Sequence, residues 1–142
     1  MEAGRFLHTD RVGRMAAEIA SELGLEAETV ELIREAAPLH DIGKYAVSDE
    51  ILLKPGPLTA GERRRMQGHT EIGRNLLRRS SSPALQLAAV IAASHHEHWD
   101  GSGYPAGLSG EEIRPAGGES LSRHTHCLAV VRRDVPPQSQ VP

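Results

Sequence analysis

At residues 40–44 the chain reads His40-Asp41-Ile42-Gly43-Lys44, an imidazole followed directly by a carboxylate. Further imidazoles stand at His8, His69, His95 and His96. Histidine and carboxylate together suit Fe, Mn, Zn, Co or Ni, and one Asp can bridge two ions while imidazoles fill the outer positions. This set of side chains therefore predicts a two-metal hydrolase site.

Any one of the eight histidines could instead be a surface residue or a hydrogen-bonded core residue. The metal interpretation is favoured because each candidate falls on the apolar stripe of a predicted helix, where an unpaired imidazole is costly to bury. Two ligand pairs are adjacent, His40 with Asp41 and His95 with His96. Neighbours on a helix differ by about 100° in direction, so each pair can reach two ions that lie side by side.

The apolar pattern predicts two helices in the first third of the chain. The first covers residues 8–23, with Gly24 as its stop, and His8 begins its inward stripe. The second covers residues 27–42, and Pro38 should bend it because proline removes a backbone donor and crowds the carbonyl four residues earlier. The inward residues are Val12, Met15, Ile19 and Leu23 in the first helix and Val30, Ile33, Ala37, His40 and Asp41 in the second.

Two more helices are predicted further along the chain. The third opens with a capping box, Thr59-Ala60-Gly61-Glu62, and the fourth opens at Ser82-Pro83, with proline at its first helical position. The inward rows are Met66, His69, Ile72, Gly73 and Leu76, then Leu85, Ala88, Ala92, His95 and His96. We therefore expect an all-α bundle whose helices direct their ligands at one metal centre.

The composition is typical of a soluble globular protein, with 39% hydrophobic and 25% charged residues and a net charge of −3. With one Phe, one Trp and two Tyr, the core must be aliphatic, and the metal centre is expected to contribute to folding.

The single Cys127 excludes an internal disulfide and favours the cytoplasm. No membrane partner is expected, because neither a spanning apolar run nor a secretory signal is present. No nucleic-acid polymer is expected either, since the arginines form one helix flank typical of a solvated face: Arg63, Arg64, Arg65, Arg74, Arg78 and Arg79.

Two loops carry further chemistry. Lys44 follows Asp41 by three residues and could contact a phosphate, although a lysine at a helix end is also favoured by the helix dipole. Residues 95–105 read His95-His96-Glu97-His98-Trp99-Asp100-Gly101-Ser102-Gly103-Tyr104-Pro105. Trp99 and Tyr104 are half of the chain's aromatic residues, and either can stack on a base or anchor the loop.

Three segments closely resemble the motifs of the HD-GYP domain, a branch of the HD metal-dependent phosphohydrolases. They are residues 40–44, residues 54–59 (Lys54-Pro55-Gly56-Pro57-Leu58-Thr59) and residues 95–105, which end in the namesake Gly103-Tyr104-Pro105. The match extends over residues 8–113. The resemblance implies a bundle of helices around a two- or three-metal centre, usually iron or manganese, that hydrolyses the bacterial second messenger cyclic di-GMP.

The resemblance also implies roles for individual residues. The metal ligands would be His8, His40, Asp41, His69, His95 and His96. Asp41 and Lys44 would be catalytic: Asp41 and an activated hydroxide would together bridge the two ions, and Lys44 would contact phosphate. The loop that contacts substrate, or partners such as diguanylate cyclase domains, would include Trp99, Asp100, Gly103, Tyr104 and Pro105. Some members hold a third metal with a Glu at the position of Gly4, so we expect two ions here.

The chain departs from the family pattern after Ile113. Family members continue there into an apolar helix with an Asp that completes the first metal's shell, whereas residues 114–120 read Arg114-Pro115-Ala116-Gly117-Gly118-Glu119-Ser120. We therefore expect an incomplete phosphohydrolase domain over residues 1–113, without its last core helix, and a divergent, disordered tail over residues 114–142. A reading-frame slip is one hypothesis for this tail.

Three functions remain open at this point. The first is an active cyclic di-GMP phosphodiesterase in which water, His124 or His126 replaces the absent Asp. The second is a catalytically impaired remnant that binds signalling partners through residues 99–105. The third is a general HD-type nucleotide phosphohydrolase. In each case regulation is expected from a separate sensory protein, because the chain has no room for a sensory domain.

Overall fold

The computed structural model describes the backbone of residues 2–113 and the side chains of residues 10–110, 112 and 113. The α-helices are α1 (Glu2–Glu22), α2 (Ala27–Ala36), α3 (Asp49–Leu52), α4 (Ala60–Gln67), α5 (His69–Leu77) and α6 (Pro83–Ser94). Short 3-10 helices are η1 (Ala37–Leu39), η2 (Ile42–Ala46) and η3 (Gly110–Glu112). Within the described backbone the one β interaction is an isolated bridge between Asp100 and Ser109. The predicted all-α fold is therefore confirmed, and the predicted tail and missing helix lie outside the described residues.

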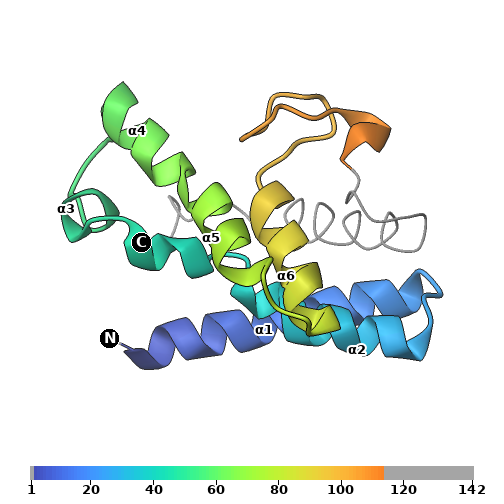
Figure 1. The fold of residues 1–142 in the computed structure, drawn as a ribbon. Helices are drawn as coiled ribbons and strands as arrows, with labels where there is room; N and C mark the ends of the chain where they lie inside the picture. The colour runs from blue at the N-terminus through green and yellow to red at the C-terminus, as the bar shows by residue number, and fades with distance from the viewer. Residues whose placement is uncertain (1, 114–142) are drawn as a thin grey trace.

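The helices pack as two pairs (Figure 1). α1 packs against α2, α5 packs against α6, and a contact between α2 and α6 joins the pairs. η2 lies against α5, while α4 leads away from the body of the domain. None of the helices in residues 2–113 has both the length and the apolar character needed to cross a membrane.

Small side chains make up much of the core. The buried cluster consists of Ala16, Ala20, Ile33, Ala36, Ala37, Leu87, Ala88 and Ile91. Small residues also line the contact of α5 with α6, where a Cβ added to Gly73 would lie 3.1 Å from the Cβ of Ala92. The backbones of these helices therefore lie close together, which brings their attached histidines close as well.

The second predicted helix is wrong over its last residues. α2 ends at Ala36, and the chain continues through η1, with Pro38 near its start, and then a turn that contains His40 and Asp41. Proline lacks the amide that an α-helix needs and crowds the carbonyl four residues earlier, so the α-helix ends instead of bending. His40 and Asp41 consequently lie in a turn between two 3-10 helices and not on a helix face.

The third predicted helix begins where expected. Thr59 Oγ1 accepts a hydrogen bond from Glu62 N at 3.3 Å, and Glu62 Oε2 accepts one from Thr59 N at 2.8 Å. Gly68 then divides the predicted helix into α4 and α5. The predicted inward orientation is wrong for two residues. Leu76 in this third predicted helix is 60% exposed, and Leu23 at the end of the first predicted helix is 57% exposed.

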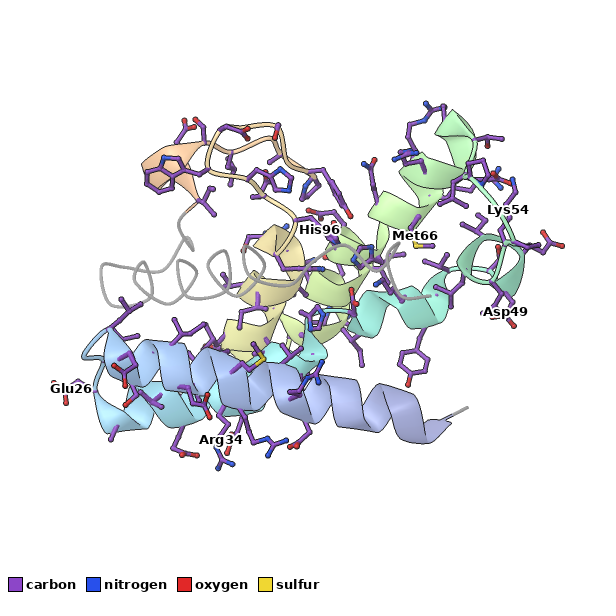
Figure 2. All side chains as sticks on the ribbon, turned by 180° about the vertical axis from the view of Figure 1, so that it is seen from behind. Glu26, Arg34, Asp49, Lys54, Met66 and His96 are labelled. Atoms are coloured by element: carbon purple, nitrogen blue, oxygen red, sulfur yellow. The ribbon has the colours of Figure 1, made fainter. Side chains whose placement is uncertain are left out.

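The fourth predicted helix, α6, begins at Pro83 as expected but ends at Ser94. His95 caps its C-terminus and His96 follows in a turn, so this ligand pair lies just beyond the helix. In Figure 2, His96 after α6 and Met66 near the end of α4 lie on the same side of the α1–α2 pair. Apart from His8, which belongs to α1, the candidate ligands are thus carried by turns and helix ends, where the chain can change direction.

Candidate metal centre

Four of the predicted ligands come together from three separate segments. Asp41 lies in the turn between η1 and η2, His69 is the first residue of α5, and His95 and His96 follow α6. One ligand atom from each residue lies within 4.8 Å of those of the other three. The fold therefore gathers donors from distant parts of the sequence into a volume suited to metal ions.

His40 lies beside this group, in the same turn as Asp41. Its Nε2 is 3.3 Å from Asp41 Oδ2, and its ring centroid is 5.2 Å from that of His95. His8 belongs to α1, but its side chain lies outside the described residues. Five of the six predicted ligands are therefore brought together.

Three of the imidazoles are oriented by the backbone of the preceding turn. Their Nδ1 atoms face carbonyl oxygens at 2.9, 2.7 and 2.9 Å, in the pairs His40 with Ala37, His69 with Met66 and His95 with Ala92. A carbonyl oxygen can only accept, so Nδ1 is the donor in each ring and a neutral ring presents a lone pair at Nε2. Hydrogen bonds from Nδ1 to the backbone fix the tautomer and orientation of histidines that bind metal through Nε2.

The Nε2 atoms converge on the carboxylate of Asp41. Oδ1 lies 3.3 Å from His69 Nε2 and 3.4 Å from His95 Nε2, and these two nitrogens are 3.3 Å apart. Oδ1 is buried and accepts no hydrogen bond from the described part of the chain. Facing lone pairs in a buried site are unfavourable unless a cation lies between them. The donor set therefore fits a divalent metal ion of the kind that imidazole and carboxylate bind.

Protons can supply the positive charge when no metal is bound. Burial acts to raise the pKa of Asp41, but His40, His69 and His95 outweigh burial when their Nε2 atoms carry protons, and they then hold this pKa far below its ordinary value. Lys44 adds a further charge, since its Nζ lies 2.6 Å from Asp41 Oδ2. Asp41 is consequently held ionised at the middle of the cluster.

Gly43 allows the Asp41 turn to pack directly on α5. A Cβ added to this buried glycine would collide with the carbonyl oxygen of His69 and would lie 2.7 Å from Gly73 N. In the sequence, Gly43 is recognisable only as part of the motif at residues 40–44. The sequence did offer one indication of its packing role, because Gly43 stands two residues after the candidate ligand Asp41. A side chain at this position would hold the turn away from α5.

The loop that follows His96 folds back onto this ligand. The ring of Tyr104 stacks on the ring of His96, with centroids 4.4 Å apart and planes inclined by 18°. Tyr104 N also donates to His96 O at 3.1 Å, and the Tyr104–Pro105 peptide bond is cis. Of the other predicted loop residues, Trp99, Asp100 and Pro105 are exposed.

A family model described as HD domain matches residues 3–117. The chain belongs to the HD domain family. Its curated relatives include a cyclic di-GMP phosphodiesterase of Thermotoga maritima, 56% identical over 110 residues, and the cyclic di-GMP phosphodiesterase response regulator RpfG of Xanthomonas campestris, 47% identical over 112 residues. A 3'3'-cGAMP-specific phosphodiesterase 2 of Vibrio cholerae is 46% identical over 110 residues. The predicted membership of the HD-GYP branch is confirmed.

These alignments cover most of this HD domain but a minor part of each relative. They include 78%, 79% and 78% of this chain, and 30%, 30% and 21% of the Thermotoga, Xanthomonas and Vibrio proteins. The HD domain therefore spans about a third of the length of its Thermotoga and Xanthomonas relatives.

Glu97 is a residue of the HD domain that sequence reasoning did not select. It is 5% exposed, and its two carboxylate oxygens accept hydrogen bonds from Ala106 N at 2.8 Å and Leu108 N at 2.9 Å. The available signal was an acidic residue directly after two candidate ligands, at the start of a glycine-rich loop. Glu97 thus joins the end of α6 to the far side of this loop.

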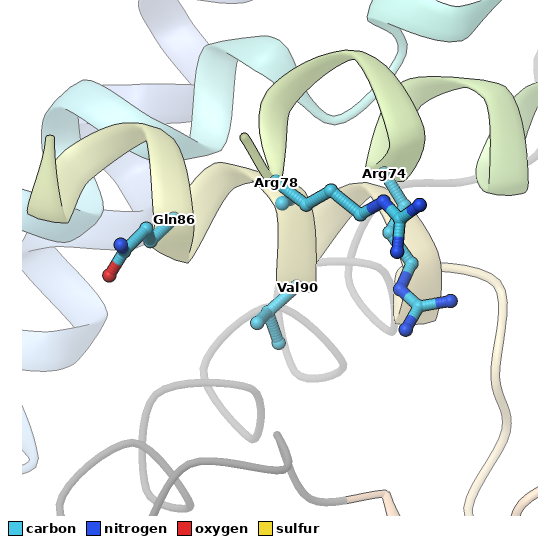
Figure 3. A pocket seen from close by; sticks show the side chains of 5 residues that line it. Arg74, Arg78, Gln86 and Val90 are labelled. Atoms are coloured by element: carbon cyan, nitrogen blue, oxygen red, sulfur yellow. The ribbon is translucent and has the colours of Figure 1, made fainter. Parts of the chain in front are cut away.

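A surface pocket of about 220 Å³ also lies between α5 and α6 of the HD domain (Figure 3). It is lined by Arg74, Arg78, Gln86, Ala89 and Val90. None of the predicted metal ligands lines it, so the pocket is separate from the candidate metal centre. All six arginines of the predicted basic flank, between Arg63 and Arg79, are exposed.

Proposed function

We propose that this chain is the catalytic domain of a metal-dependent phosphodiesterase that hydrolyses cyclic di-GMP. The observation that carries the proposal is the convergence of Asp41, His69, His95 and His96, with ligand atoms within 4.8 Å of one another. The names of the Thermotoga and Xanthomonas relatives support the same activity. A cytoplasmic setting is proposed with it, since a chain with one cysteine needs no oxidising compartment.

Two divalent ions, iron or manganese, are the proposed cofactors. Oδ1 of Asp41 faces His69 and His95, while Oδ2 faces His40, so the carboxylate offers a different oxygen to each side of the cluster. This arrangement supports a bridging role for Asp41, with His8 and His96 completing the ligand set. When bound, a metal pair supplies a Lewis acid and an activated water for phosphodiester hydrolysis.

Lys44 is proposed to bind the phosphate that is cleaved. Its ammonium group now pairs with Asp41 Oδ2 at 2.6 Å, and its side chain is partly exposed. A lysine is a flexible point charge, so Lys44 can turn from the carboxylate toward an incoming phosphate oxygen. Its charge would then help to neutralise the phosphate as negative charge develops on it.

A second candidate is a module that binds signalling partners through residues 99–105. The observation that favours it is the 57% exposure of Trp99, because large exposed aromatic side chains are enriched at protein interfaces. Diguanylate cyclase domains and a separate sensory protein are the proposed partners. This function does not need turnover, which separates it from the first proposal.

Turnover of cyclic di-GMP by the purified chain tests the proposal, after anaerobic loading with Fe(II) or Mn(II) and with 3'3'-cGAMP as a competing substrate. We expect a linear dinucleotide product, abolished in Asp41→Ala and retained in the matched control His98→Ala, whose side chain is exposed. Metal binding without turnover would contradict the enzyme proposal and favour the binding module. Turnover of unrelated phosphoesters alone would favour a general nucleotide phosphohydrolase.

A further inference from the structure

Glu97 is a buried carboxylate whose partners lie far along the chain. Its Oε1 accepts from Ala106 N, nine residues away, and its Oε2 accepts from Leu108 N, eleven residues away. Each partner is a backbone amide of the loop that returns over the metal centre. Glu97 therefore closes this loop, defined here as residues 97–108, with both of its oxygens.

The closed loop contacts a metal ligand at its middle. Tyr104 stacks on His96 with ring centroids 4.4 Å apart, and its amide donates to His96 O at 3.1 Å. Gly103 lies so close to the start of the loop that an added Cβ would be 2.5 Å from both Glu97 Cα and His96 O. The loop thus packs against the backbone and the ring of His96 at the same time.

We propose that Glu97 is a positioning residue that holds the imidazole of His96 in place through Tyr104. The proposal rests on the proposed metal-dependent function of this centre. Removal of the carboxylate would leave the amides of Ala106 and Leu108 without acceptors in a partly buried site, which favours opening of the loop. Tyr104 would then move away from His96, and the imidazole would lose the surface that restricts its rotation.

Two variants separate this positioning role from general loop stability. Glu97→Gln keeps the side-chain volume and one acceptor but points an NH₂ group at the second amide, and Glu97→Ala removes both acceptors. The matched control is Glu112→Gln, four residues after the end of this loop. Glu112 is exposed and accepts hydrogen bonds from Ser109 N at 3.3 Å and from Ser109 Oγ at 2.9 Å. Circular dichroism checks that each variant is folded, and the isosteric Glu97→Gln decides the result if Glu97→Ala does not fold.

Two measurements do not depend on catalysis. Calorimetry gives the affinity for Mn(II), and fluorescence anisotropy of Trp99, the chain's single tryptophan, reports the mobility of the loop. We expect both Glu97 variants to bind Mn(II) about 10-fold more weakly, the size of effect seen when groups that support metal ligands are removed. Their Trp99 anisotropy should also fall, whereas Glu112→Gln should change neither quantity.

Specific results would overturn the proposal. Unchanged Mn(II) affinity in folded Glu97 variants would do so, even with lower Trp99 anisotropy, because Glu97 would then hold only the loop. An equal loss of Mn(II) affinity in Glu112→Gln would also overturn the proposal, since any loosening of the chain near the loop would then be enough to weaken metal binding. Failure of the wild-type chain to hydrolyse cyclic di-GMP would contradict the proposed function alone, because both measurements here are made without substrate.

Discussion

The candidate metal centre depends on single residues that allow close approach as much as on the residues that could bind metal. Gly43 is the clearest case, because its lack of a side chain brings the backbone of η2 against the His69 carbonyl and Gly73 N. That contact places Asp41, two residues earlier, so that its Oδ1 atom lies 3.3 Å from His69 Nε2. The carboxylate and the first imidazole of the cluster are thus brought together by a backbone contact.

Gly43→Ala should therefore destabilise the domain and weaken its metal site. The added methyl group must push η2 away from α5, and overpacking of this kind costs about 1–3 kcal/mol. Urea unfolding measures the stability change, and calorimetry with Mn(II) measures the loss of affinity.

The matched control for this substitution is Gly61→Ala in α4, where an added Cβ meets nothing within 4 Å. Removing a glycine from a helix should stabilise the chain by about 0.5–1 kcal/mol. Equal stability changes of the same sign in the two variants would contradict a packing role for Gly43.

At the scale of the elements, the starts of α2, α4 and α6 were predicted better than their ends, whereas α1 begins at Glu2, six residues before its predicted start, and ends close to its predicted stop. The capping box at Thr59 and the proline at position 83 are local signals, and α4 and α6 begin where those signals stand. The apolar periodicity does not show the break at Gly68, and α2 ends before Pro38 because proline stops the α-helix where only a bend was predicted. Leu76 is exposed, whereas the smaller Gly73 lies in the contact of α5 with α6.

The candidate site was predicted largely by residue type. Imidazole and carboxylate recur in the sequence as adjacent pairs, and this chemistry identified Asp41 and its neighbours without any knowledge of the fold. The role of Glu97 could not be predicted in the same way, because its partners are backbone amides nine and eleven residues away. Backbone amides carry no sequence signal, so only the folded loop reveals them.

Thr59→Ala should destabilise the N-terminus of α4. The substitution removes the hydroxyl that accepts from Glu62 N, and loss of an N-cap typically costs about 1 kcal/mol. Ser82→Ala at the start of α6 is the matched control, because Ser82 makes no side-chain capping bond. Urea unfolding of both variants is the measurement, and an equal loss from Ser82→Ala would argue against the capping bond as the cause.

The ion pair beside this cap predicts an acid-dependent contribution to stability. Hydrogen bonds from Lys54 Nζ and from Thr59 lower the pKa of Glu62 from 4.5 to about 2. A group whose pKa is depressed by folding stabilises the native state above its unfolded pKa, and this contribution is lost as the pH falls through the folded value. The contribution of Glu62 should therefore disappear between about pH 4.5 and pH 2.

Glu62→Gln should accordingly lose stability at neutral pH but should show a shallower decline between pH 4.5 and pH 2 than the wild type. Urea unfolding at a series of pH values, with a chelator present, tests this. Lys54→Met should reproduce part of the change, since the lysine is the first cause of the shift. Parallel pH profiles for wild type and Glu62→Gln would exclude Glu62 as the source.

At the scale of the whole molecule, the candidate centre collects side chains from three segments that are far apart in the sequence. The turn that holds Asp41 follows the α1–α2 pair through η1, while His69 and His95 belong to the ends of α5 and α6. A metal ion held by all three would link these segments at one point. Metal binding should therefore stabilise the fold as a whole.

Saturation with Mn(II) should raise the thermal unfolding midpoint. A ligand at 100 times its dissociation constant that binds only the native state adds about 2.7 kcal/mol, and EDTA should reverse the effect. His69→Ala should remove this increment, whereas His98→Ala should retain it because His98 is exposed and its Nδ1 faces Ser102 Oγ at 3.0 Å. An undiminished increment in His69→Ala would show that the ion binds elsewhere.

The contact of Gly73 with Ala92 gives the α5–α6 pair a further property. Because Gly73 has no side chain where it meets the methyl group of Ala92, the two helices lie close together. His69 lies at the start of α5 and His95 directly follows α6. The distance between these two candidate ligands therefore depends on the contact of Gly73 with Ala92, which contains no flexible side chain. Substitutions at position 73 or 92 would thus change which ionic radius the centre prefers, without touching a single ligand.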